Sequence, residues 1–168
     1  MDYVEAVNKL DGMSRPFVFL AGGITQCPEW QQELVAIIQK LAPDMVGTLL
    51  NPRRKDFPIH DPNAALEQIT WEYQALNISD IFSMWFSASE SVQPICMYEL
   101  GRHLARFQCG AMRPMKIVIG IEPGYKREQD VRIQTKLVMG GLNAPAIEIV
   151  DSLEAHAKAI IEAVDELS

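Results

Sequence analysis

Glu99 is the residue whose type and position in this sequence best fit covalent or acid–base chemistry. The apolar run 81–86 is followed by a short polar loop, and Pro94 then opens a helical pattern that contains Glu99. Proline suits the first turn of a helix because its missing N–H costs nothing there. Partial positive charge at a helix N-terminus favours a nearby carboxylate, so we predict that Glu99 acts as a nucleophile or a base. The alternative is a solvated glutamate early in a helix.

Glu72 and His103 are candidate partners of Glu99. Glu72 lies between two aromatic residues in the helical segment that leads to the run 81–86. If the end of that helix faces the carboxyl edge of the strands, Glu72 can hold Glu99 in place; otherwise it is an ordinary surface glutamate. His103 follows Glu99 by one helical turn on the same face, as a partner or as a packing residue.

A glycine pair and a basic loop are candidate anion-binding elements. Gly22 and Gly23 end an apolar run and allow close approach of the backbone to a ligand, or simply a tight turn. Arg53 can bind a phosphate or carboxylate bidentately, and Asp56 can pair with an arginine or bind a sugar hydroxyl. The alternative for Arg53 and Asp56 is a solvated, charged loop.

We expect neither a cofactor nor a metal ion. The spacing around Gly22-Gly23 fits neither the dinucleotide fingerprint nor the phosphate loop of ATP-binding proteins. Cys27, Cys96 and Cys109 are odd in number and unrelated in spacing, which fits neither a disulfide framework nor a zinc site. We therefore expect reduced, partly buried thiols.

Composition indicates one globular domain over residues 1–168. The 48% hydrophobic and 22% charged content is that of a globular protein, and no apolar run approaches the length of a membrane span. The net charge of −7 disfavours binding to a nucleic acid polymer, and the basic patch 53–55 is too small for a duplex. The acidic start does not resemble a signal peptide, so we expect a cytoplasmic location and no membrane association.

Strand and helix patterns alternate along the chain. Continuous apolar runs predict buried parallel strands at 16–21, 45–50, 80–86, 116–121 and 146–150. Helical spacing predicts helices at 4–10, 30–41, 61–77, from 94, at 129–138 and from about 151 to 167. Asp61 before Pro62 is the expected start of the third of these helices.

This alternation predicts an α/β fold, a flavodoxin-like or Rossmann-like three-layer sandwich with a parallel sheet of about five strands. Ligands bind such folds beyond the carboxyl ends of the strands, where the strand order reverses. The residues expected to bind substrate at that edge are Gly22, Gly23, Ile24, Asn51, Arg53, Asp56, Ser89, Ser91 and Gln93.

The sequence from about Pro16 to Val150 resembles the nucleoside 2-deoxyribosyltransferase-like family, in the branch with a Gly-Gly first loop. The Glu-Leu-Gly element is the most specific of the shared motifs. The motifs are Phe19-Leu20-Ala21-Gly22-Gly23-Ile24, Asn51-Pro52-Arg53, Trp71-Glu72, Ser79-Asp80-Ile81 through Trp85-Phe86, and Tyr98-Glu99-Leu100-Gly101-Arg102.

The resemblance implies roles for particular residues. Glu99 takes the place of the family's catalytic glutamate, which attacks the anomeric carbon of a nucleoside and expels the base. Glu72 falls near the assisting acidic residue, where classical members have aspartate. Classical members also carry a loop aspartate before the nucleophile; here Glu90, Ser91 or Gln93 stands in its place.

The resemblance leaves three functions open. The sugar passes either to a second base or, in a nucleoside 5′-monophosphate hydrolase, to water; a third reading is a non-catalytic nucleotide-binding domain. We also expect a homodimer or higher homo-oligomer, in which Tyr125 or Asn143 completes the site of a neighbouring subunit, as in related enzymes. The apolar residues that suggest an interface are Trp71, Tyr73, Trp85, Phe86, Ile95, Met97 and Tyr98.

Overall fold

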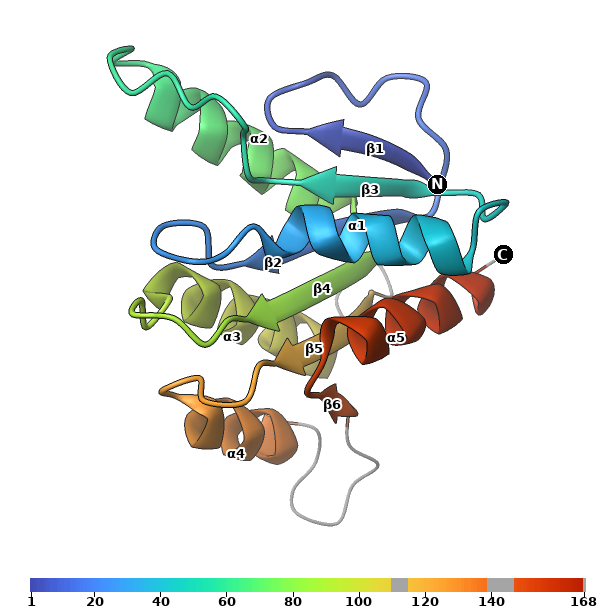
Figure 1. Ribbon diagram of the computed structural model, residues 1–168, viewed down its shortest axis with the longest axis vertical. Coiled ribbons are helices and arrows are strands. Elements are labelled where there is room, and N and C mark those ends of the chain that lie inside the picture. The colour runs from blue at the N-terminus through green and yellow to red at the C-terminus, as the bar shows by residue number, and fades with distance from the viewer. Residues whose placement is uncertain (110–114, 139–146, 168) are drawn as a thin grey trace.

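The computed structural model describes residues 1–109, 115–138 and 147–167, and its centre is a parallel β-sheet (Figure 1). Within these residues the sheet has six strands in the order β1-β3-β2-β4-β5-β6. The strands are β1 (Asp2–Glu5), β2 (Phe17–Gly22), β3 (Thr48–Asn51), β4 (Ile81–Phe86), β5 (Lys116–Ile121) and β6 (Ile149–Val150).

Helices cover both faces of this sheet. Figure 1 shows α1 and α5 side by side in front of it, with α2 and α3 behind. The helices are α1 (Trp30–Leu41), α2 (Ala64–Ile78), α3 (Pro94–Gln108), α4 (Glu128–Val138) and α5 (Leu153–Asp165). Two hydrophobic cores result, one under α1 and α5 and the other under α2, α3 and α4. The predicted three-layer sandwich is therefore confirmed.

The side chains of the two central strands, β2 and β4, point alternately into the two hydrophobic cores. In β4, Phe82, Met84 and Phe86 pack towards α2 and α3, whereas Ile81 and Trp85 pack towards α1 and α5. Successive side chains of a strand point to opposite faces. A strand that is buried on both faces is therefore apolar throughout, which is why its pattern was recognisable in the sequence.

The N-terminal segment was wrongly predicted to be a helix. It forms β1, which pairs in parallel with β3 at the edge of the sheet, with Tyr3 opposite Leu49. Val4 and Ala6 are buried, whereas Tyr3 is exposed, so the burial follows the period of a strand. Pairing with a neighbouring strand determines the conformation of such a short segment, because intrinsic secondary-structure propensities are weak.

Three elements begin later than predicted, and one of them is β6, which was expected at 146–150 and is Ile149–Val150. The helix expected from Asp61 begins at Ala64, because the Asp61 carboxylate accepts a hydrogen bond from the Asn63 N–H at 2.8 Å and turns the chain before the helix. The strand expected at 45–50 is β3, Thr48–Asn51.

Without β1, the strand order is that of flavodoxin-like proteins. The chain leaves β2 towards α1 on one face and leaves β4 towards α3 on the other (Figure 1). The carboxyl ends of β2 and β4 therefore border the crevice where this fold binds ligands. None of the helices in the described ranges is long and apolar enough to cross a membrane.

Candidate active site

A cavity of about 800 Å³ lies at the carboxyl ends of the central strands, between α2 and α3. Phe19 and Ala21 of β2 form part of its floor, and the loops after β2 and β4 form one side. Its charged and amide-bearing side chains come from the two helices and the loop before α3. They are Gln68, Glu72, Gln93, Glu99 and Arg102.

The two glutamates face this cavity from consecutive helices. Burial and, after it, the negative charge of Glu72 raise the pKa of Glu99 to about 7, against an opposing effect of Arg102. Burial also raises the pKa of Glu72, against a hydrogen bond from Gln68 that lowers it. Two half-buried carboxyls that repel one another favour retention of a proton near neutral pH. The sequence analysis predicted both residues.

Gln68 was not predicted, and it connects Glu72 to the end of β3. Its side-chain Nε2 donates to the Glu72 carboxylate at 2.7 Å and to the Pro52 carbonyl at 2.6 Å. The signal in the sequence was the spacing of four residues, which places Gln68 and Glu72 on one helical face. Many glutamines share that spacing, so it identifies no role by itself.

Gln93 begins the helix of Glu99 in a left-handed backbone conformation, with φ 51° and ψ 58°. Its Nε2 donates to the Ser87 carbonyl at 2.7 Å, and its backbone N–H donates to the Ser91 hydroxyl at 3.1 Å. The buried Oε1 of this side chain has no hydrogen-bond partner among the described residues. Left-handed conformations of residues other than glycine cluster at functional sites, and Gln93 and Ser91 both line the cavity.

The glycine pair is required by packing. A Cβ at Gly23 would lie 2.4 Å from the Cys27 Sγ and 2.7 Å from the side-chain amide of Gln93. A Cβ at Gly22 would lie 2.3 Å from the Trp30 ring. At these distances a side chain at either position would have to displace its neighbours, so packing favours glycine in the turn after β2 whether or not a ligand is bound. Gly22, Gly23 and Ile24 line the cavity.

Arg53 lies outside the cavity lining. Its guanidinium donates to the carbonyls of Cys27, at 3.2 Å, and Pro28, at 2.5 Å. Both acceptors belong to the loop between β2 and α1. These bonds tie the end of β3 to that loop, which accounts for the guanidinium without a bound anion.

Three further predicted binding residues also lie outside the lining. Asn51 is buried, and its side chain donates to the Tyr3 hydroxyl at 2.7 Å and accepts from the Arg53 N–H at 2.9 Å. Ser89 contacts the Cys27 Sγ at 3.3 Å. Asp56 is exposed in the loop after β3. The structure therefore brings together one subset of the predicted residues: Gly22, Gly23, Ile24, Glu72, Ser91, Gln93 and Glu99.

Arg102 is the cationic residue of the lining, and it lies one helical turn beyond Glu99. Its Nη2 donates to the Asn77 Oδ1 at 3.2 Å, and its guanidinium stands 5.1 Å from the centre of the Tyr73 ring. Arg102 belongs to the Glu-Leu-Gly-Arg stretch of the sequence, yet it was not predicted to be a site residue. The pattern did not show that it would reach the cavity.

Comparison with known protein families gives one match. The family model described as nucleoside 2-deoxyribosyltransferase like matches residues 15–112. The chain belongs to this family. The match extends from the segment before β2 to just beyond α3, so it includes both glutamates and Gln93. A search of curated proteins gave no significant match.

Two further candidates in this deoxyribosyltransferase-like chain have packing roles. His103 stacks on Phe82 with ring centres 4.2 Å apart, and its Nδ1 bonds the Glu99 carbonyl oxygen at 2.8 Å. Burial lowers the pKa of His103 to about 4, so it is neutral near pH 7. Tyr125 is buried against Phe86 and donates to the Val92 carbonyl at 3.0 Å. Tyr125 therefore supports the loop before α3 of its own chain and is not a surface donor.

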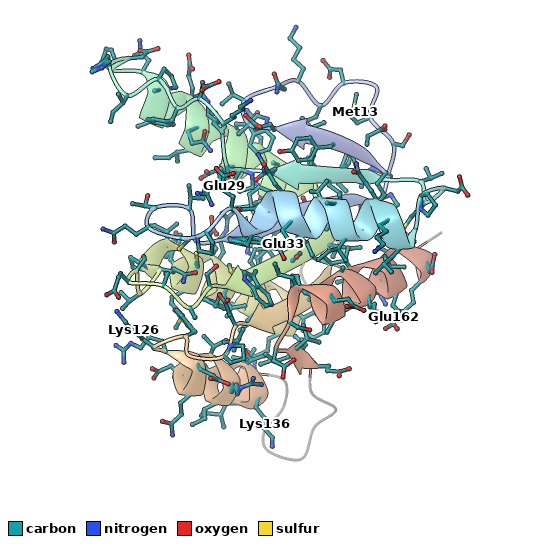
Figure 2. The ribbon with its side chains drawn as sticks, viewed as in Figure 1. Met13, Glu29, Glu33, Lys126, Lys136 and Glu162 are labelled. Carbon is teal, nitrogen blue, oxygen red and sulfur yellow. The ribbon has the colours of Figure 1, made fainter. Side chains whose placement is uncertain are left out.

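Glu90, another family-based candidate, lies at the surface. The Glu90 side chain is 91% exposed and forms an ion pair with Lys126 at 3.2 Å. Lys126 is labelled at the turn after β5 in Figure 2. Asn143 lies outside the described residues. In the ranges that the structure describes, no group of three or more His, Cys, Asp or Glu side chains could hold a metal ion.

Proposed function

We propose that this protein cleaves the N-glycosidic bond of a 2′-deoxynucleoside and transfers the sugar to a second nucleobase, with Glu99 as the nucleophile. One observation carries the proposal: two half-buried carboxyls, Glu72 and Glu99, line one cavity from consecutive helices. A pair of carboxyls is what a retaining glycosidic reaction needs, one to attack and one to exchange a proton. Membership of the family supports the same class of reaction.

The reaction consists of two displacements. A Glu99 carboxylate oxygen bonds to the anomeric carbon while the carbon–nitrogen bond breaks, and its electron pair leaves with the base. The base takes up a proton from solvent, and the ionised Glu72 carboxylate accepts the proton that the second base loses in the next step. A second base then attacks the same carbon, loses its proton and releases Glu99. A 2-deoxy sugar lacks an electron-withdrawing hydroxyl, so the oxocarbenium-like transition state forms readily.

The charge of the cavity favours a nucleoside over a nucleoside 5′-monophosphate. Glu72 and Glu99 outnumber Arg102, and Arg102 is already engaged with Asn77 and the Tyr73 ring. Arg53 is occupied by main-chain carbonyls outside the lining. A doubly charged phosphate would meet two carboxyls here, which disfavours its binding unless a second subunit contributes cations.

The exposed faces of α2 and α3 beside the cavity support a homo-oligomer, which we also propose. These faces carry five exposed apolar side chains, which we call the α2–α3 apolar patch. They are Leu66, Ile69, Tyr73, Ile95 and Tyr98. Ile69, Tyr73, Ile95 and Tyr98 also line the cavity, so a second copy seated there would close the site from water. Trp71, Trp85 and Phe86, which were expected at the interface, are buried in the core of one chain.

Product analysis tests the proposed reaction. The protein is incubated with a 2′-deoxynucleoside and a different free base, and separately with the 5′-monophosphate. An exchanged nucleoside supports the proposal, whereas free sugar phosphate favours the hydrolase and no turnover favours a non-catalytic binding domain. With a 2-fluoro-arabinosyl nucleoside, mass spectrometry should find the sugar on the peptide that contains Glu99; a label on another residue would overturn its role.

Substitution of the nucleophile provides the matched control. We expect Glu99→Gln and Glu99→Ala to lower the rate by about 1000-fold or more, because no neighbouring group replaces a lost nucleophile. Glu33→Gln is the control, since Glu33 is exposed on α1, on the opposite face of the sheet (Figure 2). It should retain the wild-type rate. A Glu99 variant that keeps more than a tenth of that rate contradicts the assignment.

A further inference from the structure

Gln68 is a polar residue of the cavity whose hydrogen bonds fix a neighbouring carboxyl. Its Nε2 lies 2.6 Å from the Pro52 carbonyl oxygen and 2.7 Å from the Glu72 Oε1. Pro52 follows β3, whereas Gln68 and Glu72 lie on α2. One amide group therefore joins the strand end, the helix and the carboxyl that faces Glu99.

These two bonds determine which way the Gln68 amide points. A main-chain carbonyl can only accept, so the atom facing Pro52 must be the nitrogen, and both of its N–H groups are then used. The amide cannot turn over without losing both bonds. The Glu72 carboxyl is held at one oxygen by a donor whose own position is set by the end of β3.

The other groups near this pair come from two elements. Glu99, Arg102 and the Cys96 thiol face the cavity from α3, and Cys27 lies close by in the loop after β2. Burial raises the pKa of Cys96 to about 12, so that thiol stays neutral near pH 7. Arg102 is the only other described charge in the lining, and it acts on Glu99.

We propose that Gln68 is a positioning residue, which holds Glu72 against the end of β3 and favours its ionised form in front of Glu99. This inference rests on the proposed function for its catalytic meaning. An N–H donated to a carboxylate stabilises the charged form and loses strength when the group is protonated. The ionised Glu72 then repels charge on Glu99, so the shared proton resides on Glu99 as the pH falls.

Removing the amide should move this proton. Gln68→Met keeps the length of the side chain and loses both donors. The pKa of Glu72 should then rise, and the pKa of Glu99 should fall because it faces less negative charge. The acid limb of the pH profile of kcat/KM should shift to lower pH, because the pKa of Glu99 is lower. The maximum of kcat/KM should fall about 10- to 100-fold, because Glu72 is less well held. A merely structural role would lower the rate equally at every pH.

The deciding experiment does not need turnover. Glutamate side chains labelled with ¹³C at the carboxyl carbon are titrated by NMR in the wild type and in Gln68→Met, with Glu72→Gln and Glu99→Gln for assignment. Gln74→Met is the matched control, because Gln74 is exposed on the same helix and lies outside this cavity. Opposite shifts of Glu72 and Glu99 in Gln68→Met, with none in the control, support the inference.

An unchanged Glu72 titration in Gln68→Met overturns the inference. If Gln68→Met does not fold, Gln68→Ala also lacks the donors and adds no charge, and it must also raise the pKa of Glu72. If the wild type cleaves no nucleoside, the proposed function fails by itself, and the titration still shows whether Gln68 acts on Glu72.

Discussion

Gly23 lies against the side chain of Gln93, so that a Cβ at position 23 would be 2.7 Å from the Gln93 amide carbon. The two residues come from the loops after β2 and β4, which border the cavity. Gln93 also bonds the Ser87 carbonyl, so its side chain has little freedom to move away. The contact therefore couples the turn after the first central strand to the residue that begins the helix of Glu99.

Gly23→Ala should disturb the site more than it disturbs the fold. The added methyl must displace Gln93 or Cys27, and overpacking of this kind destabilises by about 1–3 kcal/mol. We expect a lower melting temperature. We also expect at least a ~10-fold loss of kcat/KM, because a small displacement of residues that position the substrate lowers the rate by that order. Gly101→Ala is the control: nothing lies within 4 Å of its added Cβ in α3, so it should stabilise the protein by up to about 1 kcal/mol.

Glu99→Gln should be more stable than the wild type at alkaline pH. The pKa of Glu99 is about 7 in the folded protein, above its ordinary value of 4.5. Between these values the folded state binds more protons than the unfolded state, so the carboxyl's contribution to stability is lost as the pH rises through about 7. The amide of the Glu99→Gln variant does not ionise, so the variant does not lose this stability as the pH rises. Denaturant unfolding should therefore show a gain for Glu99→Gln at pH 8 that shrinks towards pH 4.5; a gain independent of pH would contradict this.

Arg53→Ala should weaken the loop after β2 whatever the substrate. The substitution removes the donors to the carbonyls of Cys27 and Pro28, and hydrogen bonds from a charged group contribute about 1.5–3 kcal/mol. We expect lower stability and equal fractional losses of kcat/KM for nucleosides and their 5′-monophosphates. A loss confined to the monophosphates would instead make Arg53 a phosphate ligand, as the sequence first suggested.

The α2–α3 apolar patch should hold two copies together. Light scattering at micromolar concentration should give at least twice the chain mass of 18.9 kDa. Leu66→Glu places a charge in the patch but outside the cavity lining, and it should shift the protein towards monomer. Val46→Glu is the control, since Val46 is 64% exposed just before β3. A monomeric wild type with full activity would contradict both the assembly and a shared site.

The sheet was predictable where strands are buried on both faces. The strands β2, β4 and β5 are nearly continuous apolar runs in the sequence, and such runs have few alternatives. By contrast, β1 has four residues at an edge, and the β3 register that determines its conformation is a contact across many residues of chain. The periodicity of such a short segment is ambiguous.

The site residues that could be predicted are those whose place follows from a recognisable strand–loop–helix junction. Glu99 and Gln93 lie in or beside a strand–loop–helix junction that the sequence reveals, and both face the cavity. Gln68 and Arg53 show the limit. Gln68 stands out only through its two hydrogen bonds, to the Pro52 carbonyl and the Glu72 carboxylate. Arg53 donates to main-chain carbonyls of a different loop. Neither hydrogen-bond partner can be inferred from residue type alone.

The strand β4 lies between Glu72 and Glu99 in the sequence. Its position in the sheet determines which parts of the protein can unfold locally. All six of its residues are buried, and it is paired with β2 on one side and β5 on the other. Its amide hydrogens should exchange with solvent only when the whole domain unfolds, whereas those of β1 and the two-residue β6 exchange by local opening at the sheet edges. The spacing between the helices of Glu72 and Glu99 is therefore set by the most slowly exchanging part of the chain, and it persists while either edge frays.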